Sequence, residues 1–414
     1  MTDLLETMRD RFRQAEEAEY DIRRAYDEDT RFRAGEQWPK EIEDARAAAG
    51  QPCLTINRLP QFERQILNEQ RQNRPSINVS PVDDGADVQT AKVYQGLIRH
   101  IEYDSNADVA QDRAFACATR GGFGYFRILT EYAGDSFDLE IKIRSIRDPK
   151  NVYLDPNATE PDGSDAKWGF IFDDMTRDDF EAEYPKAQAS SQWDAAGAAA
   201  PGWISGKTVR VAEYYCIEHK EVTLYLLGDN TVSETLPEGM KPLKQRTLSR
   251  PEVRWVKTNG FEILEETTWP GRWVPIIPVY GDELIVDGKR ILEGVIRHAK
   301  DSQRMYNYWA SCETSTIALA PKAPYVMAEG QDEGHEDEWK NANRDDVAYL
   351  TYKPVTFGGQ QAPPPQRQSL EPAVSAITQA RQIAADDLKA TTGIYDAALG
   401  ARGNEQSGKA ILAR

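Results

Sequence analysis

Apolar residues in the first third of the chain recur with a helical period. From residue 4 to residue 26 they lie three, four or seven positions apart among charged side chains, which is the pattern of an amphipathic helix. A second helix is expected over residues 60–74, because a proline suits its first position and another proline ends it. The stripe over residues 88–101 predicts a third helix, and Ser105 with Asp108 resembles a capping box that would begin a fourth.

The period changes at the glycine-rich stretch 121–124, after which apolar and polar residues alternate as they do in strands. A run of small residues over 187–201 is expected to form a loop. The pattern over residues 1–280 therefore predicts an α+β unit. The expected strands are Tyr125–Thr130, Phe137–Ser145, Val209–Ile217, Val222–Leu227 and Phe261–Thr268.

A long helical stripe begins at Ile291 and continues without a proline to residue 320. In the segment that follows, two short strands, Tyr325–Ala328 and Val347–Tyr352, are expected on either side of an acidic stretch. A second helix is expected over residues 369–392, where a glycine ends it. Two helices thus bracket a small α/β insert, a plan that suits a subunit whose helices pack side by side in a ring better than it suits an enzyme.

The charge balance limits what the chain can bind. Its 68 acidic and 50 basic residues give a formal net charge of -18, whereas affinity for duplex DNA normally comes from Lys and Arg. The four cysteines lie far apart without a CxxC pair, so neither a disulfide framework nor a zinc site is predicted, and we expect synthesis in a reducing cytoplasm. No apolar stretch approaches the roughly 18 residues of a membrane span, and no signal peptide is predicted.

One motif approaches a nucleotide-binding loop. Residues 403–410 fit G-x-x-x-x-G-K, but alanine stands where a P-loop needs Ser or Thr for magnesium, and no buried strand precedes it. Asp155, Asn157 and Thr159 alternate as in a calcium loop, yet Glu160 occupies the position of the required glycine. The sequence therefore predicts no catalytic residue, no cofactor and no metal site, and the protein is not expected to be an enzyme. A P-loop nucleotide hydrolase is the alternative.

Several short stretches match one family of viral proteins in order and spacing. The N-terminal ones are Phe32–Pro39, Asn57–Pro60, Arg71–Pro75, Asp148–Pro156 and Ser164–Trp168. The C-terminal ones, which are the more specific, are Arg297–Tyr306, Ile317–Pro324, Gly393–Tyr395 and Asn404–Ile411. On these residues the chain resembles the portal, or head-to-tail connector, proteins of short-tailed bacteriophages over nearly its whole length.

The resemblance implies a portal fold with an α/β wing, a two-helix stem and a small α/β clip. Portals of this type continue well beyond the equivalent of Arg414, so we expect this chain to be truncated. The implied parts are a wing over 1–290 that is helical at first and β-rich from about 121, a first stem helix over 291–320, a clip over 321–368, a second stem helix over 369–392, and a channel loop with the start of a wing helix over 393–414.

The resemblance also implies a function, namely a ring of twelve copies at one vertex of the virion capsid. Double-stranded DNA would pass through this ring during packaging and ejection. The implied partners are the scaffolding protein, the major capsid protein, the terminase large subunit and the tail adaptor protein. A different virion structural protein, such as a tail adaptor or an ejection protein, is a second alternative.

Charged and polar residues in and after the second stem helix are expected to line the channel. They are Asp386, Asp387 and Lys389 on the helix, with Arg402 and Asn404 in the channel loop. An acidic wall repels phosphates, so DNA would slide past it without binding tightly. The equally weighted alternative is that the helix charges face solvent or a neighbouring helix.

The acidic stretch of the insert is expected to dock a partner. Glu333, Glu336 and Asp337 surround Trp339, and an aromatic anchor among charges suits a transient interface with the terminase or the adaptor. Alternatively, Trp339 fills the core of the clip.

Overall fold

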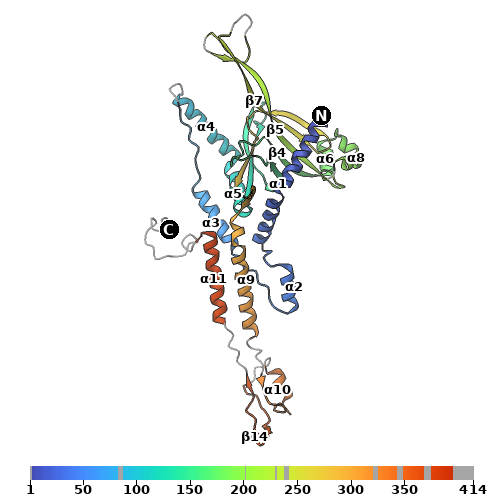
Figure 1. Ribbon diagram of the computed structural model, residues 1–414, viewed down its shortest axis with the longest axis vertical. Helices are drawn as coiled ribbons and strands as arrows, with labels where there is room; N and C mark the ends of the chain where they lie inside the picture. Colours follow the sequence, from blue (N-terminus) through green and yellow to red (C-terminus); the bar gives the residue numbers. More distant parts are fainter. Residues whose placement is uncertain are drawn as a thin grey trace. The chain divides into compact units, whose positions relative to one another are not determined.

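The computed structural model describes residues 2–82, 87–200, 202–228, 231–236, 242–319, 325–342, 348–367 and 374–394 (Figure 1). By its internal contacts the chain forms two compact units. The first unit comprises Met1–Thr30 and Ile66–Val295, and the second comprises Arg31–Gln65 and Ile296–Arg414. Helices combined with antiparallel sheets confirm the α+β class. Within the described ranges, none of the helices has the length and apolar content needed to cross a membrane.

Three helices dominate the first unit: α1 (Thr2–Ala34, whose last turn belongs to the second unit), α4 (Val88–Ser105) and α5 (Ala107–Gly121). They confirm the helices predicted over 4–26 and 88–101. The predicted capping box is wrong, because Ser105 is the buried last residue of α4. Asn106 joins α4 to α5 in the left-handed conformation, with φ 50°, which asparagine tolerates better than most residues.

Two antiparallel sheets and a hairpin complete this unit (Figure 1). The three-stranded sheet has the order β2 (Leu139–Ser145), β1 (Phe123–Tyr132), β9 (Ile276–Tyr280). The six-stranded sheet has the order β3 (Val152–Leu154), β4 (Trp168–Thr176), β5 (Thr208–Leu226), β7 (Lys244–Thr258), β8 (Ile263–Trp269), with β6 (Val232–Ser233) paired to β5. The hairpin consists of β10 (Asp282–Val286) and β11 (Lys289–Glu293).

The larger sheet is buried on both faces at the level of β4 and the first half of β5. Tyr214 belongs to one core cluster with Met8 and Phe170, whereas its neighbour Tyr215 belongs to the other with Tyr26. Successive residues of a strand point to opposite faces, so α1 contributes to the cores on both sides. Burial of each large apolar side chain stabilises the unit by about 1.5–3 kcal/mol.

Two predictions for the first unit need correction. The strand pair predicted at Val209–Ile217 and Val222–Leu227 is one continuous strand, β5, because the charged residues between them lie exposed on a projecting ribbon where no turn is required. The small-residue stretch predicted as a loop contains helices α7 (Gln188–Ser191) and α8 (Trp193–Ala199), which follow α6 (Arg177–Glu183). Alanines form helices readily, and buried Trp193 anchors α8 in the core.

The second unit is mainly helical. Its longer helices are α2 (Lys40–Ala48), the first half of α3 (Leu59–Gln72), α9 (Val295–Leu319) and α11 (Val374–Thr392). The helix predicted from Ile291 begins at Val295, because Lys289–Glu293 pairs with β10 as a strand. Gly294 separates strand from helix, and a side chain there would meet the backbone of Arg120.

The insert between α9 and α11 is small and irregular. It contains β12 (Tyr325–Val326) paired with β15 (Gln366–Arg367), helix α10 (Glu336–Asn341), and the hairpin of β13 (Thr356–Phe357) and β14 (Gln360–Gln361). The strand predicted at Val347–Tyr352 is wrong over its described part, 348–352, which has no strand pairing. There the Thr351 carbonyl accepts a hydrogen bond from the indole of Trp339 instead of from a neighbouring strand.

Candidate functional site

Helices α9 and α11 lie side by side (Figure 1) and are joined through one carboxylate. Glu313 of α9 is 15% exposed and pairs with Arg381 of α11 at 2.7 Å. Thr378, one turn earlier on α11, donates its hydroxyl to the same carboxylate at 2.8 Å. Leu388 and its alanine neighbours on α11 are buried. The two helices therefore form a defined pair, with both polar and apolar contacts.

The two predicted carboxylates of α11 lie on its exposed side. Asp386 and Asp387 are both exposed, whereas the side chain of Lys389 is 14% exposed and pairs with Asp386 at 3.2 Å. Within the described residues Asp387 makes no ion pair. Lys389 therefore offsets part of the charge of Asp386, and Asp387 is the carboxylate that contributes an unbalanced charge to this side of the helix.

Two predicted channel residues cannot be placed. Arg402 and Asn404 lie outside the described residues, as does the near-P-loop motif at 403–410. The channel-lining role of all five residues stays a prediction.

The insert is organised around a buried amide side chain. Gln331 is fully buried. Its Oε1 accepts from the backbone N–H of Ala328 at 2.8 Å, and its Nε2 donates to the carbonyl of Pro363 at 2.9 Å. Its own carbonyl accepts from the N–H of Lys353. One side chain thus ties together segments that are more than 30 residues apart, because a buried amide must satisfy its polar atoms locally.

Trp339 has structural partners within the insert. Its indole N–H donates to the carbonyl of Thr351 at 2.8 Å, and its ring meets Tyr325 edge-on at a centroid distance of 5.2 Å. The side chain is half-buried. These contacts favour the alternative in which Trp339 fills the core of the clip, and a docking role stays a prediction.

The acidic residues around Trp339 remain on the surface. Glu333 pairs with Lys353 at 2.6 Å, and Asp337 is exposed. Backbone N–H groups, its own and that of Gly334, lower the pKa of Glu336. The hydroxyl of Thr351 lowers the pKa of Glu338 in the same way, since a hydrogen bond to a carboxylate favours its ionised form. The insert therefore presents ionised carboxylates at neutral pH.

One pocket accompanies these carboxylates. It has a volume of about 470 Å³ and is lined by Glu329, Glu333, Lys353, Val355 and Phe357, among others. Phe357 is exposed. Acidic and apolar groups at a shared opening suit a partner side chain that combines an apolar stem with a positive head, such as lysine or arginine.

The calcium-like loop and the glycine-rich stretch 121–124 have local structural roles. Asp155 accepts hydrogen bonds from both nitrogens of Asn157, and Asp165 accepts from Thr159, so the calcium-like loop is held by its own side chains. Gly124 is the residue at which β1 packs closely on α5, because a side chain there would meet the carbonyl of Ala114. Among the described residues, no group of three or more His, Cys, Asp or Glu side chains is arranged to hold a metal ion.

A further set of residues, which the sequence did not reveal, fastens residues 54–58 along helix α9. The backbone N–H groups of Leu54, Ile56 and Arg58 donate to polar side chains on α9 at 2.9, 3.0 and 3.1 Å. The accepting residues are Ser311, Asn307 and Gln303, in that order. We call these three side chains the polar ladder.

The spacing of the polar ladder follows from backbone geometry. Two residues of an extended chain advance about 6.6 Å, and four residues of a helix advance about 6.0 Å. Alternate amides of the segment can therefore meet every fourth side chain of α9. The signal in the sequence was three polar residues at four-residue intervals on an otherwise apolar stripe.

Comparison with known proteins matches the chain to portal proteins. The family model described as phage P22-like portal protein matches residues 9–414. A curated portal protein from Acyrthosiphon pisum secondary endosymbiont phage 1 is 28% identical over 396 residues, covering 85% of this chain and 54% of the relative. The chain thus spans about half the length of that curated relative.

Proposed function

This chain belongs to the phage P22-like portal protein family, and from this membership we propose that copies of it form a ring at one vertex of the capsid, through which double-stranded DNA passes. The family match over 9–414 carries the proposal. Portal proteins are structural, so we assign this chain no catalytic step. The terminase large subunit and other proteins of packaging would supply the chemistry.

The helical pair and its insert fit the parts of such a ring. We assign α9 and α11 to the stem, the segment 321–368 to the clip, and most of the first unit to the wing. Residues 31–65 pack with the stem helices in the second unit, although they precede most of the wing in sequence. The polar ladder supports this assignment, because it fastens residues 54–58 to the first stem helix.

The stem charges suit a channel wall. Asp386 and Asp387 on the exposed side of α11 would recur in every copy, and rings of carboxylate repel the phosphate backbone. DNA would then meet no strong binding site along this part of the channel during transport. Glu333, Glu336 and Asp337 of the clip, with the nearby pocket, would dock the terminase during packaging and the tail adaptor afterwards. Scaffolding and major capsid proteins are the remaining partners in this proposal.

Electron microscopy of the purified chain tests the ring directly. Rings with a central hole wide enough for duplex DNA are expected, and twelve copies of a 46.7 kDa chain would give a particle of about 560 kDa by mass photometry. A chain that remains monomeric at high concentration, alone and with scaffolding protein, would contradict the proposal. Subunits that assemble only onto a ring of another protein would favour an adaptor instead.

ATP turnover tests the enzymatic alternative. We expect none above background. Turnover that Lys409→Ala abolishes would establish a nucleotide hydrolase and refute a purely structural role.

A further inference from the structure

Strands β5 and β7 extend beyond the sheet to which they belong (Figure 1). Strand β4 pairs with β5 only as far as Cys216, and β8 pairs with β7 only from Val253. Beyond these points the two strands continue as a two-stranded ribbon, joined near its far end by β6. The ribbon is therefore accessible on both faces.

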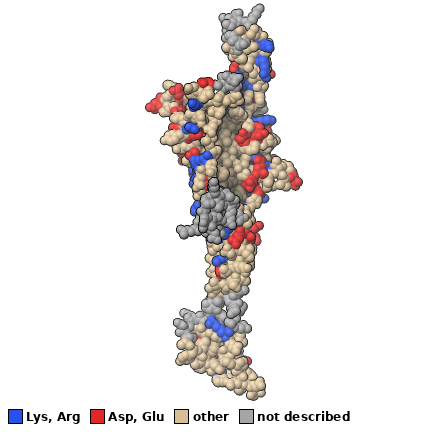
Figure 2. Space-filling view, turned by 90° about the vertical axis from the view of Figure 1, so that its left-hand side faces the viewer, with Lys and Arg blue, Asp and Glu red and all other residues tan. Residues whose placement is uncertain are grey.

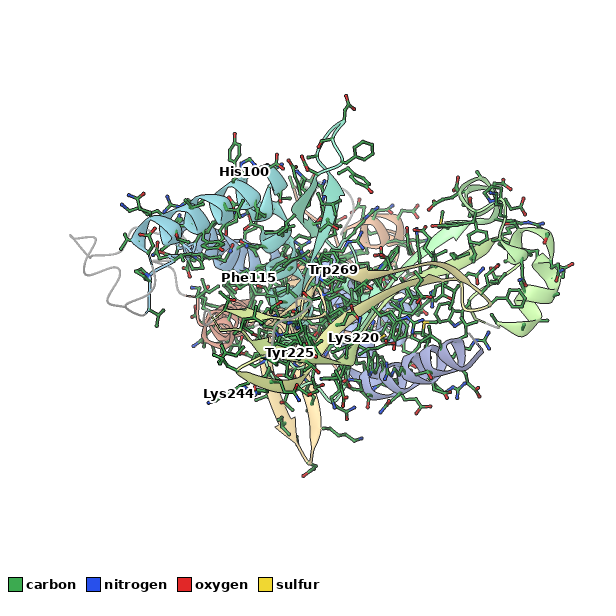
Figure 3. All side chains as sticks on the ribbon, turned by 90° about the horizontal axis from the view of Figure 1, so that it is seen from above. His100, Phe115, Lys220, Tyr225, Lys244 and Trp269 are labelled. Atoms are coloured by element: carbon green, nitrogen blue, oxygen red, sulfur yellow. The ribbon has the colours of Figure 1, made fainter. Side chains whose placement is uncertain are left out.

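One face of this ribbon is basic. Side chains alternate between the faces of a strand, and the pairing register sets even-numbered residues of β5 opposite even-numbered residues of β7. The cations on this face are Lys220, Lys244, Arg246 and Arg250, and the apolar residues among them are Val222, Leu224, Leu226 and Leu248. We call this set the basic face. All four cations are exposed. Figure 2 shows Lys and Arg gathered along one side of the projecting ribbon, and Figure 3 labels Lys220 and Lys244.

The cations of the basic face are poorly balanced within the chain. Arg250 pairs with Glu234 at 2.6 Å. Among the described residues, Lys220, Lys244 and Arg246 make no ion pair. Lys220 also lies directly opposite Arg250, and like charges in that position destabilise a strand pair.

The base of the same ribbon gives a contrast. Glu218 lies directly opposite Glu252, which is also an unfavourable pair. Here, however, the chain supplies its own counter-ion, because Arg254 pairs with Glu218 at 3.0 Å and with Glu266 at 2.6 Å. Arg254 thus partly neutralises the carboxylates at the base of the ribbon, whereas the cations of the basic face remain available to attract an external anion.

We propose that the basic face binds the phosphate backbone of double-stranded DNA without sequence specificity. The inference rests on the proposed function, which brings duplex DNA to this chain. Lys244 and Arg246 are two strand positions apart, about 6.8 Å, which equals the axial rise of two nucleotides in one DNA strand. A straight row of cations at this spacing fits a regular polyanion better than it fits a folded acidic protein. Contacts to phosphate carry no sequence information.

The test measures binding of the purified 414-residue chain to a fluorescein-labelled 40-base-pair duplex of mixed sequence as salt concentration is varied. The test variant combines Lys220→Gln, Lys244→Gln and Arg246→Gln. If each of these cations neutralises one phosphate, the slope of log affinity against log salt becomes less steep by about 2.7. Over a fourfold rise in salt, the wild-type affinity should then fall about 40-fold more than that of the variant.

A matched control separates the basic face from bulk charge. Lys92→Gln, Arg99→Gln and Lys186→Gln remove three other exposed cations of the first unit, so both triple variants have the same net charge. Arg246→Lys alone should retain the wild-type slope, since it keeps the charge. Circular dichroism and thermal melting establish that each variant is folded.

Three outcomes would overturn the proposal: no measurable binding by the wild type, equal slopes for wild type and test variant, or an equal change in both triple variants. Loss of rings in the test variant with an unchanged DNA slope would also overturn it and assign the face to a neighbouring copy. The portal proposal fails separately, if the wild type binds DNA but forms no rings in electron microscopy.

Discussion

Asn307 occupies the middle of the polar ladder, and its replacement should destabilise the second unit. Its side chain accepts from Ile56 N–H at 3.0 Å and from the Gln303 amide at 2.9 Å, and it donates to Gln37 Oε1 at 2.6 Å. Asn307, Gln303 and Gln37 are all at most 2% exposed. Asn307→Ala removes all three hydrogen bonds at once.

The magnitude follows from the groups left unpaired. A buried polar group without its partner costs about 1–3 kcal/mol of stability. Gln37 Oε1 would lose its hydrogen bond to Asn307 while it remains buried, so the whole of this cost is expected there. Gln303 keeps its hydrogen bond to the Ile56 carbonyl, and Ile56 is 40% exposed, so water can replace part of its loss. We expect a loss of about 2–4 kcal/mol in free energy of unfolding, or a fall of about 6–12 °C in melting temperature.

Hydrogen exchange is the sharper assay, because two units need not unfold together. In the wild type, the amides of residues 54, 56 and 58 should exchange more slowly than those of 55 and 57. In the Asn307→Ala variant, the amide N–H of Ile56 should be the first of these three to lose its protection from exchange. Thr314→Ala is the matched control, since among the described residues that hydroxyl bonds only to the Ala310 carbonyl of its own helix.

A double-mutant cycle completes the test. Asn307 and Gln37 share a hydrogen bond, so Asn307→Ala and Gln37→Ala should couple by about 0.5–3 kcal/mol. Additive effects, or an Asn307→Ala variant as stable as the Thr314→Ala control, would refute the reasoning.

Three further predictions concern other parts of the chain. Gly124→Ala should prevent stable folding of the first unit, because the added methyl group would meet the backbone of α5. Gly96→Ala has open space around it and should stabilise α4 by about 0.5–1 kcal/mol. Thermal melts compare the two variants, and equal melting temperatures would contradict the close approach of β1 to α5. Glu313→Gln should lower the free energy of unfolding by about 1 kcal/mol through loss of its ion pair between α9 and α11. Urea denaturation measures the change, and an unchanged midpoint would count against that contact. The pKa of Glu338 is lowered in the folded chain, so the stability that its carboxylate contributes is complete above the ordinary pKa of 4.5 and is lost as pH falls through the folded value. In Thr351→Val, NMR titration should show the pKa of Glu338 rising toward 4.5. An unchanged pKa would show that the Thr351 hydroxyl does not cause the shift.

Helices with one apolar stripe could be predicted from the sequence, because their period depends on local spacing alone. Helix α1 follows the stripe over 4–26, and α11 ends at a glycine with a positive φ, as expected. The exact beginning of α9 could not be predicted. Lys289–Glu293 becomes a strand only because β10 pairs with it, and this tertiary contact outweighs the helical pattern around Ile291.

The ribbon of β5 and β7 shows a second limit. A charged run between two apolar runs predicts a turn, since a buried strand would not contain it. On a ribbon that is exposed on both faces, the same charges remain in water while the backbone hydrogen bonds continue. The sequence could not show that β5 leaves its sheet at this point.

The residues of the candidate site could be identified from the sequence, but their contacts could not. Acidic residues around Trp339 were identified, yet the partner of its indole, the carbonyl of Thr351, belongs to a segment predicted as a strand. The polar ladder was missed because its acceptors, taken singly, are ordinary polar residues on a helix. Only the long-range pairing with residues 54–58 gives them a shared role.

The three side chains of the polar ladder differ in length, and the order matters. Each makes a hydrogen bond of about 3 Å, so the distance between the segment and the helix backbone is set by serine, then asparagine, then glutamine. We therefore expect the segment to lie closest to α9 at Leu54 and furthest from it at Arg58, just before α3 begins at Leu59. We expect these graded lengths to set the angle at which the chain leaves α9, so that exchanging Ser311 with Gln303 would change that angle while keeping the composition of the ladder unchanged.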